Sequence, residues 1–153
     1  MSIKWNCLNN KAKKYIKEGY KGIDLYYKLL KEFEGKPYLW GGEDIDGCDC
    51  SGTVCAALSN SLGLCIRETA DDLFKKYFVK NVSVFDDMNG YTAVFFLNKA
   101  GKAVHVAGYC GDGFFINMSS LEPNEICHRR TLSELCQMYN HLDMKIRRFE
   151  VYK

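Results

Sequence analysis

Apolar side chains recur at helical spacing in the first half of the chain. Residues 24–34 place five of them on one face: Leu25, Tyr26, Leu29, Leu30 and Phe33. Gly35 then ends this predicted helix, and Pro37 prevents its continuation. A second helix is predicted to begin near Cys50 and to end at Gly63, because glycine can adopt the left-handed conformation that closes a helix.

Two further helix starts are marked by capping boxes. Residues 69–72 (TADD) have the spacing of a capping box, with Asp in place of the usual Glu, and apolar residues follow them at helical spacing. Residues 131–134 (TLSE) form the second box, which predicts a short helix through about Tyr139. Both helices are therefore expected to begin at a threonine.

From about residue 82 the hydrophobic period shortens and strands are predicted. Four segments have the character of strands: residues 93–97, 103–109, 114–118 and 144–152. Turn residues at 98–102 and 111–113 connect the first three as consecutive hairpins. Because the helices come before the hairpin strands, the chain predicts an α+β fold in which N-terminal helices pack on an antiparallel sheet.

The composition is that of a globular protein without a linker. The chain has 153 residues, of which 47% are hydrophobic and 26% charged, and its two prolines and its glycines are not clustered. We therefore expect residues 1–153 to form a single domain. Residues 1–23 are too short for a domain of their own, and they are expected to be an extra, helical N-terminal segment.

The net charge of +2 gives no case for binding nucleic acid, although the charge is unevenly spread. Residues 1–36 carry nine Lys against four acids, a balance of about +5, so the remainder carries about −3. The preferred interpretation is a solvated basic helix face. The alternative is attraction to an anionic surface such as a cell wall or a membrane.

The eight cysteines raise the question of the compartment. Residues 1–6 lack a charged segment followed by an apolar one, so no secretion signal is predicted, and we expect a cytoplasmic protein with reduced cysteines. No apolar run reaches transmembrane length, so no integral membrane segment is expected. The cysteines also lack the paired CxxC spacing of a zinc site, and we expect neither a metal nor a cofactor.

Cys50 stands where a polar loop is predicted to turn into a helix. A thiol nucleophile must be deprotonated, whereas a free cysteine has a pKa of roughly 8.5. A helix N-terminus offers partial positive charge and unpaired N–H groups to the residue that opens it. Because the following Ser51 and Gly52 are small, the thiol is left uncovered, and Cys50 is predicted to be a nucleophile.

His105 is the predicted base for this thiol. The chain has three histidines; His128 adjoins two arginines and is interpreted as a surface residue, and His141 is assigned no role. A lone histidine in a strand is usually structural. The predicted nucleophile nevertheless requires a basic partner, and this requirement favours His105.

Asn117 is the predicted third group, which accepts the other N–H of the imidazole. It follows His105 by twelve residues, across the turn at 111–113, so both side chains can lie on the same face of a hairpin. Taken alone, a strand asparagine more often bonds to a backbone group. Together, Cys50, His105 and Asn117 form the Cys-His-Asn arrangement of papain-like proteases.

The chain at this point resembles a known family, the NlpC-type peptidoglycan cysteine peptidases, a compact bacterial branch of the papain-like fold. Six segments carry the resemblance, in the order PYLWGG (37–42), DCSG (49–52), RET (67–69), VFF (94–96), HVAGY (105–109) and FIN (115–117). The first two blocks are specific when they occur together. One departure lies before the fourth segment, where the family usually has Pro-Gly-Asp and this chain has Gly-Tyr-Thr at 90–92.

The resemblance implies a catalytic role for four residues. Cys50 would attack the scissile carbonyl, and His105 would act as base and then as acid. Asn117 would take the third position, which in this family is His, Asn or Gln. Tyr38 would lie near the thiol and help to hold the oxyanion.

The resemblance also implies a substrate and its binding residues. Asp49 and Ser51 would line the subsite for the amine end of the substrate, Arg67 would support the substrate-side loop, and Trp40 would belong to the same binding region. The family usually hydrolyses γ-D-glutamyl–diamino-acid bonds in the stem peptides of peptidoglycan. A protein made in the cytoplasm would reach the wall after release, as a phage-type lysin, or after delivery as a toxin, or it would act in cytosolic recycling; the lysin is preferred.

Two alternatives to a wall peptidase stay open at the level of the sequence. The first is a papain-like amidase or acyltransferase that acts on a lipid or on another peptide. The second is a non-catalytic binding module or a thiol redox protein, suggested by the number of cysteines and by Cys48, two residues before Cys50. The oligomeric state is not indicated by any of these patterns.

Overall fold

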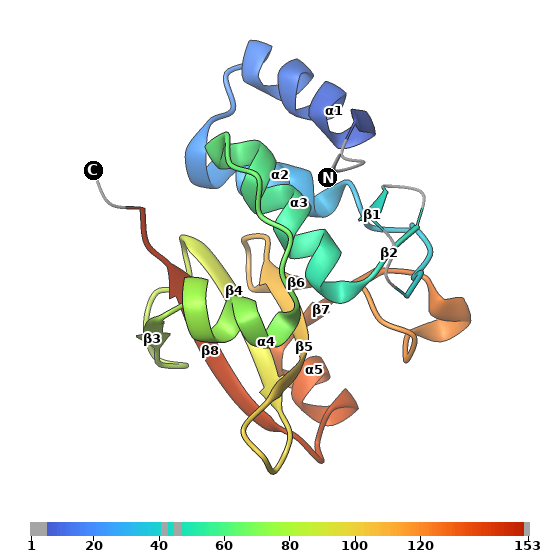
Figure 1. The fold of residues 1–153 in the computed structure, drawn as a ribbon, viewed down its shortest axis with the longest axis vertical. Helices are drawn as coiled ribbons and strands as arrows, with labels where there is room; N and C mark the ends of the chain where they lie inside the picture. Colours follow the sequence, from blue (N-terminus) through green and yellow to red (C-terminus); the bar gives the residue numbers. More distant parts are fainter. Residues whose placement is uncertain (1–5, 41–42, 45–46, 152–153) are drawn as a thin grey trace.

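The computed structural model describes residues 6–40, 43–44 and 47–151 of the chain. Its helices gather largely on one side of a long antiparallel sheet (Figure 1). They are α1 (Asn6–Lys17), α2 (Gly22–Lys31), α3 (Cys50–Leu62), α4 (Ala70–Asp72) and α5 (Leu132–Met138), with a π-helical turn η1 (Leu73–Tyr77) and a 3-10 turn η2 (Pro123–Glu125). Helix α1 lies within the segment 1–23, where the sequence predicts a helix.

The main sheet has six antiparallel strands in the order β3-β8-β4-β5-β6-β7. The strands are β3 (Lys80–Val82), β4 (Tyr91–Leu97), β5 (Ala103–Tyr109), β6 (Phe114–Asn117), β7 (His128–Thr131) and β8 (Asp143–Phe149). A separate pair, β1 (Glu43–Asp44) and β2 (Gly47–Cys48), lies in the segment that was predicted to be a polar loop. The predicted α+β class with helices on an antiparallel sheet is confirmed.

The helix predicted over residues 24–34 is wrong at its C-terminal end. Helix α2 stops at Lys31, because the next amides bond to carbonyls three residues back rather than four, as Phe33 does to Leu30 at 3.1 Å. Gly35 follows in the left-handed region with φ +84°. The apolar face therefore continues past the helix itself, and Phe33 is still buried.

Strands β3 and β7 were not predicted from the sequence. They are three and four residues long, and β7 reads HRRT, without apolar alternation. Their pairing is set by neighbours in the sheet, β8 for β3 and β6 for β7, rather than by a pattern of their own.

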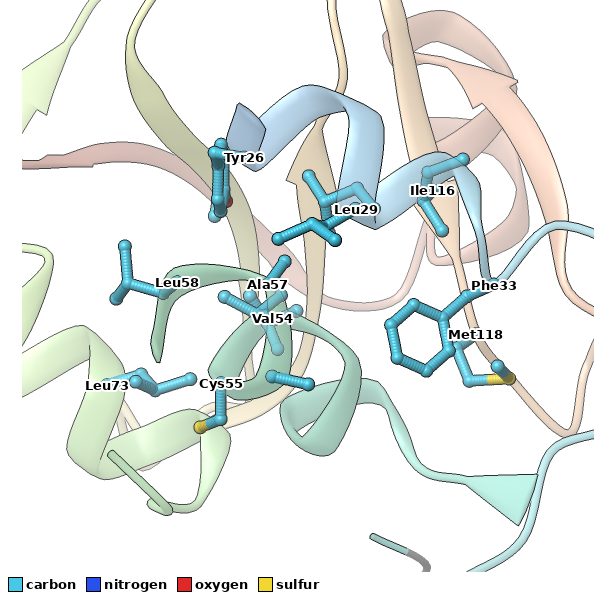
Figure 2. Close-up of a cluster of buried hydrophobic side chains, with 14 of the residues drawn as sticks. Tyr26, Leu29, Phe33, Val54, Cys55, Ala57, Leu58, Leu73, Ile116 and Met118 are labelled. Atoms are coloured by element: carbon cyan, nitrogen blue, oxygen red, sulfur yellow. The ribbon is translucent and has the colours of Figure 1, made fainter. Parts of the chain in front are cut away.

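Helix α3 forms the centre of the larger core, between α2 and the sheet (Figure 2). The buried side chains from Val54 to Leu58 include all sides of the helix rather than one face, so α3 is enclosed by protein. The residues around it come from α2 and the turn after it, from η1, and from the end of β6 and the residue after it: Tyr26, Leu29, Phe33, Leu73, Ile116 and Met118.

A second core covers the opposite face of the sheet. It joins alternate residues of the central strands to α5 and the residue after it: Val94, Phe96, Ala107, Tyr109, Phe115, Leu135 and Tyr139. In the part of the chain that the structure describes, no helix is both long enough and apolar enough to cross a membrane.

Gly108 on β5 allows α2 to approach the sheet closely. A Cβ atom at this position would lie 2.9 Å from both terminal methyls of Leu30 and 3.1 Å from the hydroxyl of Tyr26. We expect Gly108→Ala to lower the free energy of unfolding by about 1–3 kcal/mol, because the added methyl overpacks this contact. Chemical denaturation of the purified variants measures this change.

Leu30→Ala provides the matched control for Gly108→Ala. Alone it should cost about 2–5 kcal/mol, as other buried leucines do. In the double variant, the new methyl enters the space that Leu30 vacates, so the combined cost should be clearly less than additive. Strictly additive costs would contradict the close approach of α2 to β5.

Candidate active site

Asp49 starts helix α3 and so places Cys50 at its first turn. Asp49 is the N-cap residue, and its Oδ1 accepts a hydrogen bond from the amide of Gly52 at 2.7 Å. At the other end, Gly63 closes the helix in the left-handed conformation with φ +68°. Both predicted bounds of this helix, near Cys50 and at Gly63, are confirmed.

The thiol of Cys50 lies at the junction of α3 and β5. Burial raises its pKa to about 11, and hydrogen bonds from the backbone N–H groups of Val106 and Ser51 act in the opposite direction. Val106 directly follows His105 on β5, so the packing of α3 on this strand brings the thiol next to the histidine's own segment. This raised pKa favours the neutral thiol at rest, whereas a helix N-terminus alone would favour the thiolate.

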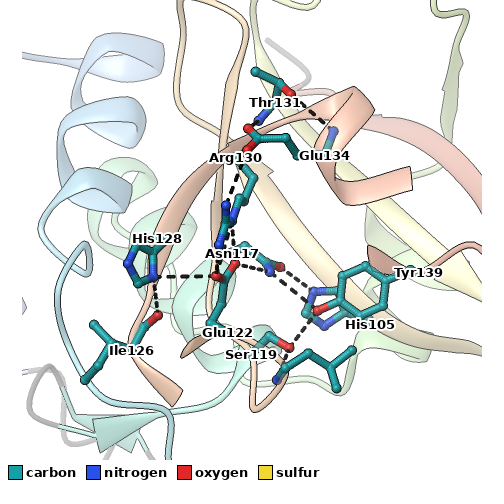
Figure 3. A network of polar contacts seen from close by, with 11 residues as sticks. His105, Asn117, Ser119, Glu122, Ile126, His128, Arg130, Thr131, Glu134 and Tyr139 are labelled. Atoms are coloured by element: carbon teal, nitrogen blue, oxygen red, sulfur yellow. Dashed lines mark hydrogen bonds and ion pairs between the residues drawn. The ribbon is translucent and has the colours of Figure 1, made fainter. Parts of the chain in front are cut away.

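His105 and Asn117 form a buried hydrogen-bonded pair (Figure 3). The distance between His105 Nε2 and Asn117 Oδ1 is 2.7 Å. In the register of β5 and β6, Gly108 lies opposite Ile116, and because side chains alternate along a strand, His105 and Asn117 point to the same face of the sheet. Because an amide oxygen only accepts, Nε2 must carry the proton, and Nδ1 is left as the basic nitrogen.

An aromatic ring fixes the plane of the imidazole. Tyr139, the residue after α5, stacks on His105 with ring centroids 4.5 Å apart and an angle of 24° between the planes. The hydroxyl of Tyr139 donates to Ser119 Oγ at 2.6 Å, which holds the ring in place (Figure 3). The imidazole can therefore change its protonation without changing its orientation.

The burial of His105 also sets its charge. Loss of solvent lowers its pKa to about 4, against the raising effects of the Asn117 hydrogen bond and the charge of Glu122. Near neutral pH the imidazole is thus uncharged and able to take a proton.

Tyr38 is held beside this site by backbone pairing. It forms a bridge with Cys48, and the amide of Leu39 donates to the carbonyl of Cys48 at 2.9 Å. Burial, and next the charge that Cys50 would carry as a thiolate, raise the pKa of Tyr38 to about 12. The phenol is therefore protonated near the thiol and can donate a hydrogen bond.

A groove of about 810 Å³ begins at Cys50 and contains all four predicted substrate-binding residues. Within it, Arg67 Nη2 lies 3.2 Å from Asp49 Oδ2, and Arg67 Nη1 donates to Ser51 Oγ at 3.1 Å. Ser51 also donates to Asp49 Oδ1 at 3.2 Å, so the three side chains form one polar cluster. Trp40 stands at the groove with 82% of its surface exposed.

The far end of the groove was not predicted. It is lined by residues of the α4 start and the β5 start, with the acidic side chains of Glu68, Asp71 and Asp72 and the cation of Lys102. Asp71 Oδ1 accepts from the amide of Ala103 at 3.0 Å, which ties these two segments together. The capping box at 69–72 predicted that a helix begins in this segment, but it gave no indication that the segment contacts β5.

Glu122 is the main residue at the site that sequence reasoning missed. It lies in the loop after β6, is 2% exposed, and accepts a hydrogen bond from Asn117 Nδ2 at 2.8 Å (Figure 3). Arg130 on β7 pairs with the same carboxylate. His128, which was interpreted as a surface residue, has a half-exposed side chain whose Nδ1 lies 3.5 Å from Glu122.

Cys48 has the environment of a core thiol. It is fully buried, and burial raises its pKa to about 12. A buried, protonated thiol is a poor partner for disulfide exchange, which argues against the redox alternative. Within the described part of the chain, no three His, Cys, Asp or Glu side chains are grouped as metal ligands would be.

Comparison with known proteins agrees with this fold. A family model described as the NlpC/P60 family matches residues 35–142, and the chain belongs to that family. Among curated proteins, it is 35% identical over 88 residues to a probable endopeptidase, YafL, of Escherichia coli, a match that covers 57% of this chain and 35% of the relative. The murein DD-endopeptidase MepH of E. coli is 34% identical over 90 residues, covering 58% and 33%.

The solved structures show the same fold. An NlpC/P60 family protein from Bacillus cereus superposes with a TM-score of 0.68 at 24% identity, over 84% of this chain and 40% of that one. The family resemblance and the papain-like fold expected from the sequence are therefore confirmed. The chain spans about a third of the length of the curated relatives it matches.

The burial of His105 should make the folded protein less stable in acid. The unfolded histidine takes up a proton below about pH 6.5, whereas the folded one stays neutral until about pH 4. Between these values the unfolded state binds more protons, so stability falls as the pH falls, by up to about 3 kcal/mol. Urea denaturation at a series of pH values measures this loss.

His105→Gln is the control for this acid effect, because glutamine does not titrate. The difference in stability between wild type and variant should depend on pH only between about 4 and 6.5. Parallel curves for the two proteins throughout this range would show that His105 is not buried in its neutral form.

Proposed function

We propose that this protein is a cysteine peptidase that hydrolyses amide bonds in the stem peptides of peptidoglycan. The observations that carry the proposal are the buried His105–Asn117 pair and the thiol of Cys50, which lines a groove and bonds to the backbone N–H of Val106, the residue after His105. The similarity to two proteins named as endopeptidases, one of them for murein, supports the substrate class.

In the proposed reaction, the sulfur of Cys50 attacks the scissile carbonyl carbon while the thiol proton passes to Nδ1 of His105. Because both groups are neutral at rest, thiolate and imidazolium form together during the attack. The C–N bond then breaks, and the imidazolium gives its proton to the leaving amine. Water, deprotonated by His105, hydrolyses the resulting thioester and restores the thiol.

The negative charge of the tetrahedral intermediate needs donors that are already in place. The proposed donors are the backbone N–H of Cys50, at the start of α3, and the phenol of Tyr38. The neutral state of that phenol, with its raised pKa, is what this role requires. Asn117 keeps the proton on Nε2 of His105, so that Nδ1 can act as the base.

The groove supports a peptide with charged groups at both of its ends. We assign Asp49, Ser51 and Arg67 to the amine end of a stem peptide and Trp40 to contact with its apolar part. The bond assigned is the γ-D-glutamyl–diamino-acid bond. A papain-like amidase or acyltransferase with another substrate is the alternative that a substrate panel would identify.

The route to the wall is part of the same proposal. We propose that the protein is made in the cytoplasm and meets peptidoglycan after release, as a phage-type lysin does. The exposed lysines of α1 (Lys11, Lys13, Lys14 and Lys17) support attraction to an anionic wall.

Purified wall peptides test the proposed activity directly. Wild-type protein should release new free amines, which mass spectrometry detects and assigns to a bond. Cys50→Ala should abolish the release, because it removes the attacking sulfur. Cys48→Ala should keep at least about half of the activity, because this thiol is buried and has no assigned role. Equal cleavage by wild type and Cys50→Ala would sink the proposal.

Tyr38→Phe tests the proposed oxyanion donor. Loss of the phenolic hydroxyl should lower kcat by about 10- to 100-fold, somewhat less than the loss of a stronger donor, and should leave KM nearly unchanged. Tyr109→Phe is the matched control, since its hydroxyl accepts from Gly113 in the distant hairpin turn. If Tyr38→Phe is as active as this control, the phenol of Tyr38 is not an oxyanion donor.

A further inference from the structure

Glu122 places a buried negative charge directly behind the His105–Asn117 pair. We infer that Glu122 is a positioning residue for the proposed peptidase: its carboxylate orients the Asn117 amide, and through this amide it selects the imidazole tautomer of His105. The inference rests on the proposed function for its consequence in catalysis. Its structural content, the orientation of an amide and the place of a proton, can be measured separately.

The contacts form a chain from strand β7 to the imidazole. Arg130 donates from Nε to Glu122 Oε2 at 3.0 Å and from Nη2 to Oε1 at 2.5 Å. Glu122 Oε2 accepts from Asn117 Nδ2 at 2.8 Å, and Asn117 Oδ1 lies 2.7 Å from His105 Nε2. Figure 3 shows these four side chains in sequence, with Asn117 between the carboxylate and the ring.

In each of these hydrogen bonds, only one of the two partners can be the donor. An ionised carboxylate can only accept, so the NH₂ end of the Asn117 amide must face Glu122. The oxygen end then faces His105, where it can only accept, so the ring proton stays on Nε2. A flipped amide would present NH₂ to the ring and would favour the opposite tautomer, in which Nδ1 is protonated and cannot act as the base.

The position of Glu122 fits this role better than a role in stability alone. Its side chain is fully buried, whereas a buried ion pair adds little stability compared with apolar residues of the same size. Its charge also acts on the ring directly, since it raises the pKa of His105 against the effect of burial. The other charged or titratable groups of the described residues that interact with Glu122 are Arg130, which neutralises it, the half-exposed His128, the buried thiol of Cys127 and the phenol of Tyr139.

Glu122→Gln is the variant that tests the inference. It keeps the shape of the side chain but replaces a group that only accepts hydrogen bonds with one that can also donate them. The amide of glutamine can present either end to Asn117. The matched control is Glu34→Gln, which breaks a similar two-bond pair with Arg129, the neighbour of Arg130, on the surface. For both variants we would record the ¹⁵N NMR spectrum of the histidines, with His105→Gln to assign the signal of His105.

Two readouts should change in Glu122→Gln and stay as in wild type in Glu34→Gln. The NMR signal should show His105 moving from the Nε2–H tautomer to a mixture. With wall peptides, kcat should fall by about 10- to 100-fold while KM stays unchanged. This loss is part of the rate enhancement of about 10²- to 10⁴-fold that a general base contributes. A folded Glu122→Gln protein with the wild-type tautomer, or an equal change in Glu34→Gln, would overturn the inference.

The tautomer separates this inference from the proposed function. If wild type cleaves no wall peptide but Glu122→Gln still changes the tautomer, the positioning role stands and the proposed substrate falls. If Glu122→Gln does not fold, Arg130→Lys replaces it, because lysine keeps the charge but cannot hold both oxygens in a fork. That variant should shift the tautomer in the same direction to a smaller extent, and an unchanged tautomer would again overturn the inference.

Discussion

The burial of helix α3 on all sides is the constraint on which the site depends. Because protein surrounds this helix, between α2, η1 and the sheet, its position against β5 is set by core packing and not by any catalytic residue. Asp49 caps the helix, so its first residue is always Cys50. The thiol thus meets the backbone N–H of Val106, and the reactive segment of the chain is placed by the same contacts that stabilise the fold.

Burial also gives the site its chemical character. It raises the pKa of Cys50 and lowers that of His105, and both shifts favour the neutral form. In the proposed reaction, a proton passes from the thiol to the imidazole. The polar groups behind the imidazole then decide which nitrogen is the base. Glu122, held by Arg130, accepts a hydrogen bond from the Asn117 amide, and the oxygen of that amide bonds to Nε2 of His105. Tyr139 stacks on the imidazole and holds the plane of the ring. The orientation of the His105 ring is therefore set by Tyr139, and the position of its proton by Asn117 and Glu122.

The sequence predicted the parts of this arrangement that depend on local pattern. Alternation and turn residues predicted the hairpin that carries His105 and Asn117. The end of a polar loop before Cys50 and the stop at Gly63 predicted the helix that Cys50 begins. Glu122 could not be found in this way, because its burial comes from an arginine on a strand too short and polar to be recognised. The single-domain organisation of residues 1–153 and the functional roles of the site residues stay predictions.

The central claim is that Cys50 forms a covalent acyl intermediate with a wall peptide. The most direct test is the intact mass of the protein after acid quenching during turnover of a purified stem peptide, followed by peptide mapping. The account predicts a mass gain equal to the acyl half of the substrate, located on Cys50 and absent in His105→Gln. Turnover without any adduct on Cys50, or an adduct on another cysteine, would contradict it.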